Sequence, residues 1–421
     1  MGRMTTVTIV VILLAAYTPC LAADWRGFRG PNRDGKSLEA GLLRQWPEGG
    51  PRRLWSVGGL GKGLASVSAG QQMLFTTGLH GKKGFVFAFD PSGQLKWKSS
   101  YGPEWNKCFP GARTTPTFDS GRVYVISGIG NVVCLDAENG QTLWRVDTVK
   151  RFAADCGALG MTESALVVDD VVICTPGGPD VTMAALDKMT GKTVWKCRVP
   201  GEKAACCSPV LIERGGRKII VTMLQQSIIG VDARTGRLLW QDKFADYQDD
   251  AGTINFVSPI YSDGKLYATS GDNDGGAMYE LSEDGTRITR LWTDDILDCH
   301  HGGVVQVGDY VYGANYRNLW SGDWVCLEWE TGKVMYEQRW HSKGSTIYAD
   351  GMLYCYEEKS GNVALVNPTP RGFEIVSSFQ VKEGNGRHLA HPAIADGVLY
   401  IRRGNTLTAW DIRDTSVSLA K

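Results

Sequence analysis

The sequence predicts an all-β protein whose strands close into an eight-bladed β-propeller. Three observations predict it: an aromatic residue that recurs at a steady period, a tight turn that precedes it, and three further strand-like runs in each period. The aromatic residue recurs at intervals of 42 to 52 residues, at Trp55, Trp97, Trp144, Trp195, Trp240, Trp292, Tyr336 and Phe379.

The turn before the aromatic residue has the pattern Asp-x-x-Thr-Gly or a close variant. Clear copies are Asp136–Gly140, Asp187–Gly191 and Asp232–Gly236, each followed four residues later by Trp. An Asp at the start of a turn can accept backbone hydrogen bonds, and Gly adopts positive φ without strain. We therefore expect a hairpin turn, with the Trp packing between neighbouring sheets.

The rest of each period contains three runs with strand-like alternation, such as Arg122–Ile126 and Asn131–Leu135. The first run of each period begins near Ser66, Thr115, Ser164, Ser208, Ser258, Gly303, Ser345 and His391. Four antiparallel strands in a period of ~45 residues are typical of a propeller blade. No stretch has a helical period, which argues against a parallel α/β fold.

The number of strands predicts how the ring closes. Eight first strands exist, but the last repeat ends near Asp411 without a fourth strand. A spare strand, Arg52–Trp55, stands at the other end of the chain. We expect it to complete the last blade, which removes two free sheet edges. A seven-bladed ring with an irregular extra repeat is the alternative.

The first residues predict a signal peptide over 1–22, followed by a single domain over 23–421. Arg3 precedes the apolar run Val7–Ala16, and small residues surround a cleavage point after Ala22. An uncleaved N-terminal anchor is the alternative. We expect export to the periplasm or the extracellular space, with no transmembrane segment in the mature chain.

The charge balance limits the kinds of partner that we expect. Lys plus Arg and Asp plus Glu are both 45, so the formal net charge is zero. Nucleic-acid binding requires a basic surface, so we expect no nucleic-acid partner. We expect a monomer that meets a protein or polysaccharide ligand at the channel mouth or at the blade edges.

Ten cysteines remain after cleavage, and most stand in apolar runs, where Cys behaves as a small hydrophobe. We expect mainly buried thiols. The adjacent pair Cys206 and Cys207 leaves three interpretations open: two ordinary thiols, a structural disulfide between neighbours, or a ring that stacks on a quinone.

The repeat Asp-x-x-Thr-Gly-x-x-x-Trp resembles the pyrroloquinoline-quinone-type (PQQ-type) repeat of quinoprotein alcohol dehydrogenases and of BamB-type outer-membrane assembly factors. Asp24–Gly35, Cys174–Gly178 and His300–Val305 further resemble secreted PQQ-like propellers of planctomycetes and related bacteria. The resemblance implies this fold over the mature chain. Its dehydrogenase members imply PQQ and Ca²⁺ as possible cofactors.

In a propeller, the loops that lead into the innermost strands line one mouth of the channel, the default position for a site. Five of the six histidines fall in or beside these loops, although they can equally stabilise the rim. The candidate ligand-binding or cofactor-binding residues are Arg113, Glu163, Cys206, Cys207, Asn255, His300, His301, His388 and His391. The resemblance to dehydrogenases makes Glu163 and Asn255 candidate cation ligands and Asp298 a candidate catalytic base. No spacing predicts a zinc site.

Two functions follow. The favoured one is an exported binding or scaffold propeller for a protein or polysaccharide, without catalysis. The alternative is a PQQ- and Ca²⁺-dependent dehydrogenase that oxidises an alcohol or a sugar. A glycan hydrolase would additionally need a pair of carboxylates flanking the bond.

Overall fold

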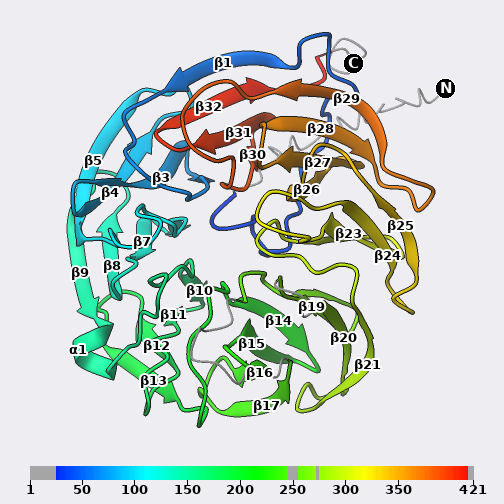
Figure 1. The fold of residues 1–421 in the computed structure, drawn as a ribbon. Coiled ribbons are helices and arrows are strands. Elements are labelled where there is room, and N and C mark those ends of the chain that lie inside the picture. Colours follow the sequence, from blue (N-terminus) through cyan, green and yellow to red (C-terminus); the bar gives the residue numbers. More distant parts are fainter. Residues whose placement is uncertain (1–24, 245–254, 272–274, 416–421) are drawn as a thin grey trace, which may run out of the picture.

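The computed structural model describes residues 25–244, 255–271 and 275–415, and its strands form a ring of eight four-stranded antiparallel sheets (Figure 1). The predicted eight-bladed propeller is confirmed. The expected signal peptide, residues 1–22, lies outside the described residues.

Blades 1 to 4 follow one another along the chain. Blade 1 contains β2 (Ser68–Gly70), β3 (Met73–His80), β4 (Lys83–Phe89) and β5 (Leu95–Pro103). Blade 2 contains β6 (Thr117–Asp119), β7 (Arg122–Ile126), β8 (Asn131–Asp136) and β9 (Thr142–Asp147). Blade 3 contains β10 (Leu166–Val168), β11 (Val171–Cys174), β12 (Met183–Asp187) and β13 (Thr193–Cys197). Blade 4 contains β14 (Val210–Arg214), β15 (Arg217–Met223), β16 (Ser227–Asp232) and β17 (Leu238–Lys243).

Blades 5 to 8 complete the ring. Blade 5 contains β18 (Ile260–Ser262), β19 (Lys265–Thr269), β20 (Gly276–Leu281) and β21 (Ile288–Asp294). Blade 6 contains β22 (Val305–Val307), β23 (Tyr310–Ala314), β24 (Trp324–Glu328) and β25 (Val334–Gln338). Blade 7 contains β26 (Gly344–Ala349), β27 (Met352–Glu357), β28 (Asn362–Asn367) and β29 (Glu374–Gln380). Blade 8 contains β30 (Ala393–Ala395), β31 (Val398–Arg403), β32 (Thr406–Asp411) and β1 (Arg52–Val57). Within the described residues, the one helix is α1 (Thr148–Phe152), which follows β9.

The ring closes as predicted, through β1. This strand pairs antiparallel with β32, and the sheet order is β1-β32-β31-β30. Arg52 lies opposite Asp411 and forms an ion pair of 2.7 Å with it. The last blade therefore takes its outer strand from the N-terminal part of the chain, and the seven-bladed alternative is wrong.

In six of the eight blades, the recurring Trp joins its blade to the next. The indole N–H of Trp144 in blade 2 donates to the carbonyl of Lys188, in the turn of blade 3, at 3.0 Å. The same bond repeats from Trp55, Trp97, Trp195, Trp240 and Trp292. The turn glycine lies against this ring: a Cβ on Gly191 would stand 2.8 Å from Trp144. The repeat pattern thus encodes a contact between blades as well as a turn.

The cysteines are mostly interior. All ten in the described residues are unpaired, and seven of them are buried. The expectation of mainly buried thiols is confirmed, and Cys206 and Cys207 are both free thiols. In the part of the chain that the structure describes, none of the helical segments has the length and hydropathy of a membrane span.

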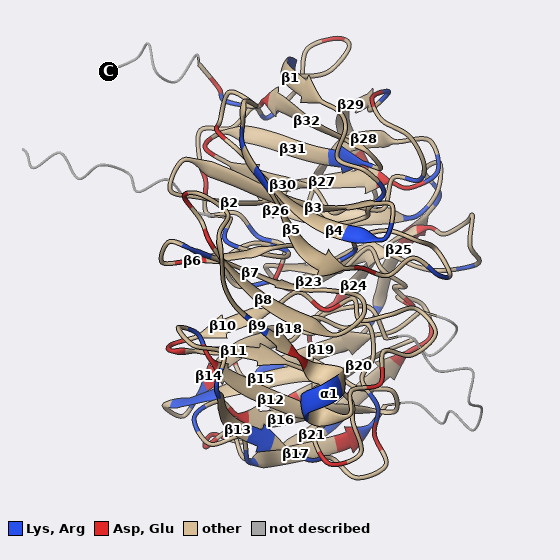
Figure 2. Cartoon of the chain, turned by 90° about the vertical axis from the view of Figure 1, so that its left-hand side faces the viewer, with Lys and Arg blue, Asp and Glu red and all other residues tan. Residues whose placement is uncertain are grey.

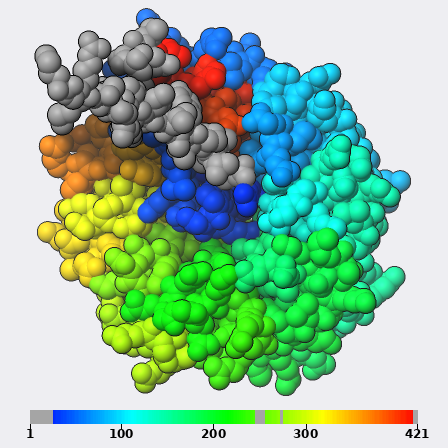
Figure 3. Space-filling view, turned by 180° about the vertical axis from the view of Figure 1, so that it is seen from behind, coloured from blue at the N-terminus to red at the C-terminus, as the bar shows by residue number. Residues whose placement is uncertain are grey.

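A segment before β1 crosses one end of the channel, and we call residues 25–37 the N-terminal plug. Figure 3 shows this segment in blue at the centre of that face. The Ala69 N–H donates to the Trp25 carbonyl at 2.8 Å, and the Tyr348 N–H donates to the Gly35 carbonyl at 2.8 Å. The plug thus bonds to the innermost strands of blades 1 and 7, which lie on either side of the closing blade.

Candidate functional site

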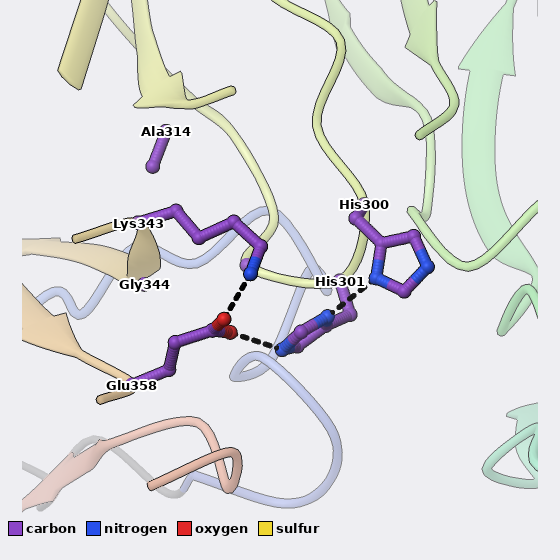
Figure 4. Close-up of a pocket in the computed structure, with 7 residues that line it drawn as sticks. His300, His301, Ala314, Lys343, Gly344 and Glu358 are labelled. Atoms are coloured by element: carbon purple, nitrogen blue, oxygen red, sulfur yellow. Dashed lines mark hydrogen bonds and ion pairs between the residues drawn. The ribbon is translucent and has the colours of Figure 1, made fainter. Parts of the chain in front are cut away.

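The end of the channel opposite the plug is the mouth. Because the strands of each blade run antiparallel, the loops before the first strand and the loops between the second and third strands lie at this same end. A small pocket opens here between blades 6 and 7 (Figure 4). Its lining residues are His300, His301, Gly302, Ala314, Lys343, Gly344 and Glu358.

Four polar side chains form a connected row in this pocket. Lys343 Nζ donates to Glu358 Oε1, and His301 Nε2 lies 2.8 Å from Glu358 Oε2. His301 Nδ1 lies 2.8 Å from His300 Nδ1, so one of these two nitrogens carries the shared proton (Figure 4). Burial alone would raise the pKa of Glu358, but His301 and Lys343 together hold that pKa below its ordinary value. Glu358 is therefore a carboxylate at neutral pH.

His300 is the member of the row farthest from Glu358. Its ring stacks on Tyr316 at 4.6 Å between centroids and contacts Phe256 at the same distance. Burial, and then the neighbouring His301 and Lys343, lower the pKa of His300 to about 3. His300 is thus a neutral imidazole at neutral pH, able to donate or accept one hydrogen bond depending on its tautomer.

The plug supports this row from inside the channel. His391 Nε2 lies 2.7 Å from the carbonyl oxygen of His301, and Arg29 Nη1 lies 3.3 Å from His391 Nδ1. Arg29 is fully buried and also donates to the carbonyls of Val304 at 2.6 Å and Thr346 at 3.3 Å. Burial lowers the pKa of Arg29 to about 10, so the guanidinium stays charged at neutral pH.

A second plug arginine fills the other side of the channel. Arg33 donates to the carbonyls of Ser164 at 2.9 Å and Pro209 at 3.0 Å, and it also bonds to Ala165. These carbonyls belong to the starts of blades 3 and 4. The two guanidinium groups therefore bridge innermost strands around the ring and occupy the channel behind the mouth.

The predicted site residues separate into two groups. The structure brings His300, His301 and His391 together, as described. The buried His388 joins the row only through its backbone N–H, which donates to the Glu358 carbonyl at 3.2 Å; its Nδ1 lies 2.6 Å from the Tyr356 hydroxyl, and burial lowers the pKa of His388 to about 4.

The remaining candidates secure loops at the mouth. Arg113 donates to the carbonyls of Leu159 and Cys108. Asp298 Oδ1 accepts from the Gly275 N–H at 3.0 Å. Arg113 and Asp298 thus each bind backbone in a neighbouring loop.

Glu163 and Asn255 each use only one of their polar atoms within the described residues. Glu163 Oε1 accepts from the Thr175 N–H at 2.6 Å, and Asn255 Nδ2 donates to the Leu224 carbonyl at 2.6 Å. Glu163 Oε2 and Asn255 Oδ1 are buried without a hydrogen-bond partner among the described residues. Burial raises the pKa of Glu163 to about 7.

These residues do not fit a calcium–quinone site. The two unpartnered oxygens suit a cation, but Arg33 binds the carbonyl of Ser164, next to Glu163, and its positive charge would repel Ca²⁺. The Cys207 thiol is buried in the wall, 3.4 Å from the Val257 carbonyl, and burial raises the pKa of Cys206 and Cys207 to about 11. Within the described ranges, no three His, Cys, Asp or Glu side chains group as metal ligands.

The sequence interpretation did not single out Lys343, Glu358 or the two plug arginines. A signal existed for the arginines, because Arg29 and Arg33 stand in a Gly-rich stretch outside the repeats. For Glu358, the only signal was its position directly after a second strand. The sequence interpretation also missed Trp320. This side chain is 55% exposed on the rim, and the Arg387 guanidinium lies 4.2 Å from the centroid of its ring.

Comparisons with known proteins agree with this fold. The quinoprotein ethanol dehydrogenase of Pseudomonas aeruginosa is 29% identical over 188 residues, which are 42% of this chain and 29% of that enzyme. BamB of Shewanella oneidensis is 22% identical over 284 residues, 63% of this chain and 66% of that protein. The chain thus spans less than a third of the dehydrogenase's length.

Solved structures show the same architecture. BamB from Moraxella catarrhalis superposes with a TM-score of 0.62 at 17% identity, covering 85% of this chain and 97% of that one. A quinohemoprotein alcohol dehydrogenase from Comamonas testosteroni superposes with a TM-score of 0.69 at 13% identity, covering 93% and 80%. A family model described as outer membrane protein assembly factor BamB matches residues 82–337, more than half of the sequence. The chain therefore belongs to this BamB-like family of PQQ-type propellers.

Proposed function

We propose that this chain is a binding module that holds a segment of a partner protein at the mouth, over blades 6 to 8. The observation that carries the proposal is the exposed Trp320, next to the pocket of His300 and His301. Arg387 covers one face of its indole ring. Trp and Arg supply much of the binding energy at protein interfaces.

The loop around Trp320 is fixed in place. Ser342 Oγ donates to the Trp320 carbonyl at 2.9 Å, and Lys343 Nζ donates to the Leu319 carbonyl at 3.1 Å. The Trp320 N–H donates to Asn318 Oδ1 at 2.9 Å. A large side chain that is ordered before binding loses little entropy on binding, which favours recognition. Leu319, 48% exposed, extends the apolar surface.

Because the channel behind the mouth is filled, a ligand would bind at this surface. Arg29 and Arg33 fill the channel behind the mouth, so a bound segment would lie across the rim instead of passing through. The family's name, outer membrane protein assembly factor, is consistent with a protein partner. With the signal-like N-terminus, we propose that the protein works in an exported compartment, periplasmic or extracellular.

Site-specific crosslinking tests the proposal. A photoreactive phenylalanine analogue replaces Trp320 in one variant and Val194 in another; Val194 is 54% exposed on the outer strand β13. We expect one discrete adduct from position 320 and none from position 194. The partner identified by mass spectrometry should then bind the purified Trp320→Ala variant roughly 30-fold more weakly than wild type. Equal adducts at both positions, or unchanged affinity in Trp320→Ala, would contradict the proposal.

The alternative function is a PQQ- and Ca²⁺-dependent dehydrogenase for an alcohol or sugar. The unpartnered oxygens of Glu163 and Asn255 favour it, as do the names of the matched dehydrogenases. The position of Arg33 beside Glu163 and the buried Cys207 thiol weigh against it.

A further inference from the structure

We propose that the mouth carries a basic rim over blades 8, 1 and 2, and that this rim recognises an acidic, extended protein segment. The inference rests on the proposed function, since it names the chemistry of the partner. The basic rim consists of Lys62, Lys82, Lys83, Lys107, Arg387 and Arg403.

Backbone and side-chain hydrogen bonds show that the rim is continuous. Arg403 Nε donates to the Gly386 carbonyl at 3.0 Å, next to Arg387. The Leu60 N–H donates to the Asn405 carbonyl at 3.0 Å, which joins the blade 8 loop to the segment of Lys62.

The same chain of contacts continues into blades 1 and 2. Lys62 exchanges two backbone hydrogen bonds with Leu79, of 3.0 and 2.8 Å, at the end of β3. The Glu104 N–H donates to the Lys82 carbonyl at 3.1 Å, which brings the hairpin of Lys82 and Lys83 against the loop of Lys107. Figure 2 shows Lys and Arg in blue at the ends of β31 and β4.

Few acidic residues stand beside this rim. The segments 58–63, 79–83, 103–113, 384–388 and 403–405 contain one acidic residue, Glu104, and Glu383, directly before the fourth segment, is paired with Arg53. Glu104 is buried, and its carboxylate accepts hydrogen bonds from the Tyr101 hydroxyl and the Gly128 N–H, each at 2.6 Å. The six rim cations take part in none of the ion pairs found among the described residues.

Acidic residues stand in other loops of the mouth. The loop that leads into blade 6 carries Asp295 and Asp298, directly after Asp294 at the end of β21, and the loop that leads into blade 3 carries Asp155, which pairs with Lys203. A formal net charge of zero over the whole chain thus conceals an uneven distribution. An uneven field of this kind orients an acidic partner as it approaches, and salt weakens the effect.

Three of the six cations are held at definite positions, which favours discrete carboxylates over a diffuse anionic surface. The Arg387 guanidinium lies 4.2 Å from the Trp320 ring centroid, and Lys107 Nζ lies 5.4 Å from that of Trp105. Arg403 is bonded to two backbone carbonyls. The rim also continues into the apolar surface of Trp320, so one segment can place an apolar side chain there and its acidic residues along the rim.

The test uses the full chain and a fluorescent glutamate-rich peptide as the probe. The rim variant carries Lys62→Gln, Lys82→Gln, Lys83→Gln and Lys107→Gln, all at exposed positions. The control variant carries Lys192→Gln, Arg234→Gln, Arg237→Gln and Lys333→Gln, which remove the same charge from exposed turns at the other end of the blades. We expect the rim variant to bind about tenfold more weakly at low salt, with the control within about twofold of wild type.

Two results would overturn the basic rim: equal peptide affinity in the rim variant and wild type, or phosphatidylglycerol vesicles that bind wild type as tightly as the peptide. The crosslinked partner separates this failure from failure of the proposed function. If that partner still requires Trp320 but ignores the rim variant, the rim proposal fails and the binding function stands. If neither Trp320→Ala nor the rim variant affects it, both fail.

Discussion

Arg29 Nη1 lies 3.3 Å from His391 Nδ1, and this contact joins the plug at one end of the channel to the histidines at the other. His391 in turn contacts His301, since its Nε2 lies 2.7 Å from the carbonyl oxygen of His301. The geometry of the mouth therefore depends on a side chain that enters the channel from the far face.

Replacing Arg29 with Ala should destabilise the fold. The change leaves the carbonyls of Val304 and Thr346 buried without this donor, at an expected cost of about 3–5 kcal/mol in the free energy of unfolding. Chemical denaturation measures it. Arg44→Ala is the matched control: Arg44 is exposed and pairs with Asp350, so its loss should cost at most about 1 kcal/mol. Equal losses in the two variants would refute the bracing role of Arg29.

Gly303→Ala should interfere with the same arginine. A Cβ on Gly303 would stand 1.9 Å from Arg29 Nη1, and its φ is +71°. Gly308 is a control for the backbone strain alone, since its φ is +57° and its Cβ would meet nothing within 4 Å. We expect Gly303→Ala to lose about 2 kcal/mol more stability than Gly308→Ala. Similar losses of stability in the two variants would mean that Arg29 shifts away from the new Cβ at no cost in free energy.

Stability should fall in mild acid because of the buried histidines. Burial, and then the charge of Arg29, lower the pKa of His391 from 6.5 to about 3. The unfolded chain then binds more protons than the folded chain, so this stability is complete above pH 6.5 and is lost as the pH falls toward 3. His300 and His388 add to the effect in the same direction.

The comparison of urea unfolding at pH 7.5 and at pH 5 measures this dependence. His391→Gln should reduce the difference between the two pH values. His341→Asn, at an exposed position, should leave the difference as in wild type. A wild-type stability that does not change between these pH values would contradict the assignment.

The contributions of Glu358 and Lys343 to the stability of the fold should depend on each other. Both side chains are at least 93% buried, and they form an ion pair. Glu358→Leu alone leaves a buried ammonium without its partner and should cost about 3–5 kcal/mol. The double variant Glu358→Leu with Lys343→Met removes both charges and should recover most of that loss. An additive double variant would show that the pair is not coupled.

Much of the fold could be predicted from the sequence because the information is local and repeated. The Asp-x-x-Thr-Gly turn and the Trp four residues later lie in one hairpin, so their pattern predicts each blade. The closure through β1 followed from the strand count alone. The turn glycine's contact with the Trp of the preceding blade was not predicted, because it joins one repeat to the next.

The site was predicted only in part, because its contacts join segments from different repeats. His300, His301 and His391 were recognised because they lie in loops that a propeller brings to one mouth. Their link to Arg29 spans most of the chain, and no pattern inside a repeat encodes it. The two family-like segments, Asp24–Gly35 and His300–Val305, were identified separately. The structure shows that they meet, since Arg29 bonds to the carbonyls of Gly302 and Val304.

We propose a propeller that binds a partner at its mouth and does not use a quinone. Titration of the purified chain with PQQ and Ca²⁺, followed by absorbance and dye-linked alcohol oxidation, distinguishes this function from that of a dehydrogenase. We expect no stoichiometric quinone spectrum and no turnover, because Arg33 binds the carbonyl of Ser164, next to Glu163, where the cation would bind. Stoichiometric binding of PQQ with turnover, lost in Glu163→Gln, would instead establish the dehydrogenase.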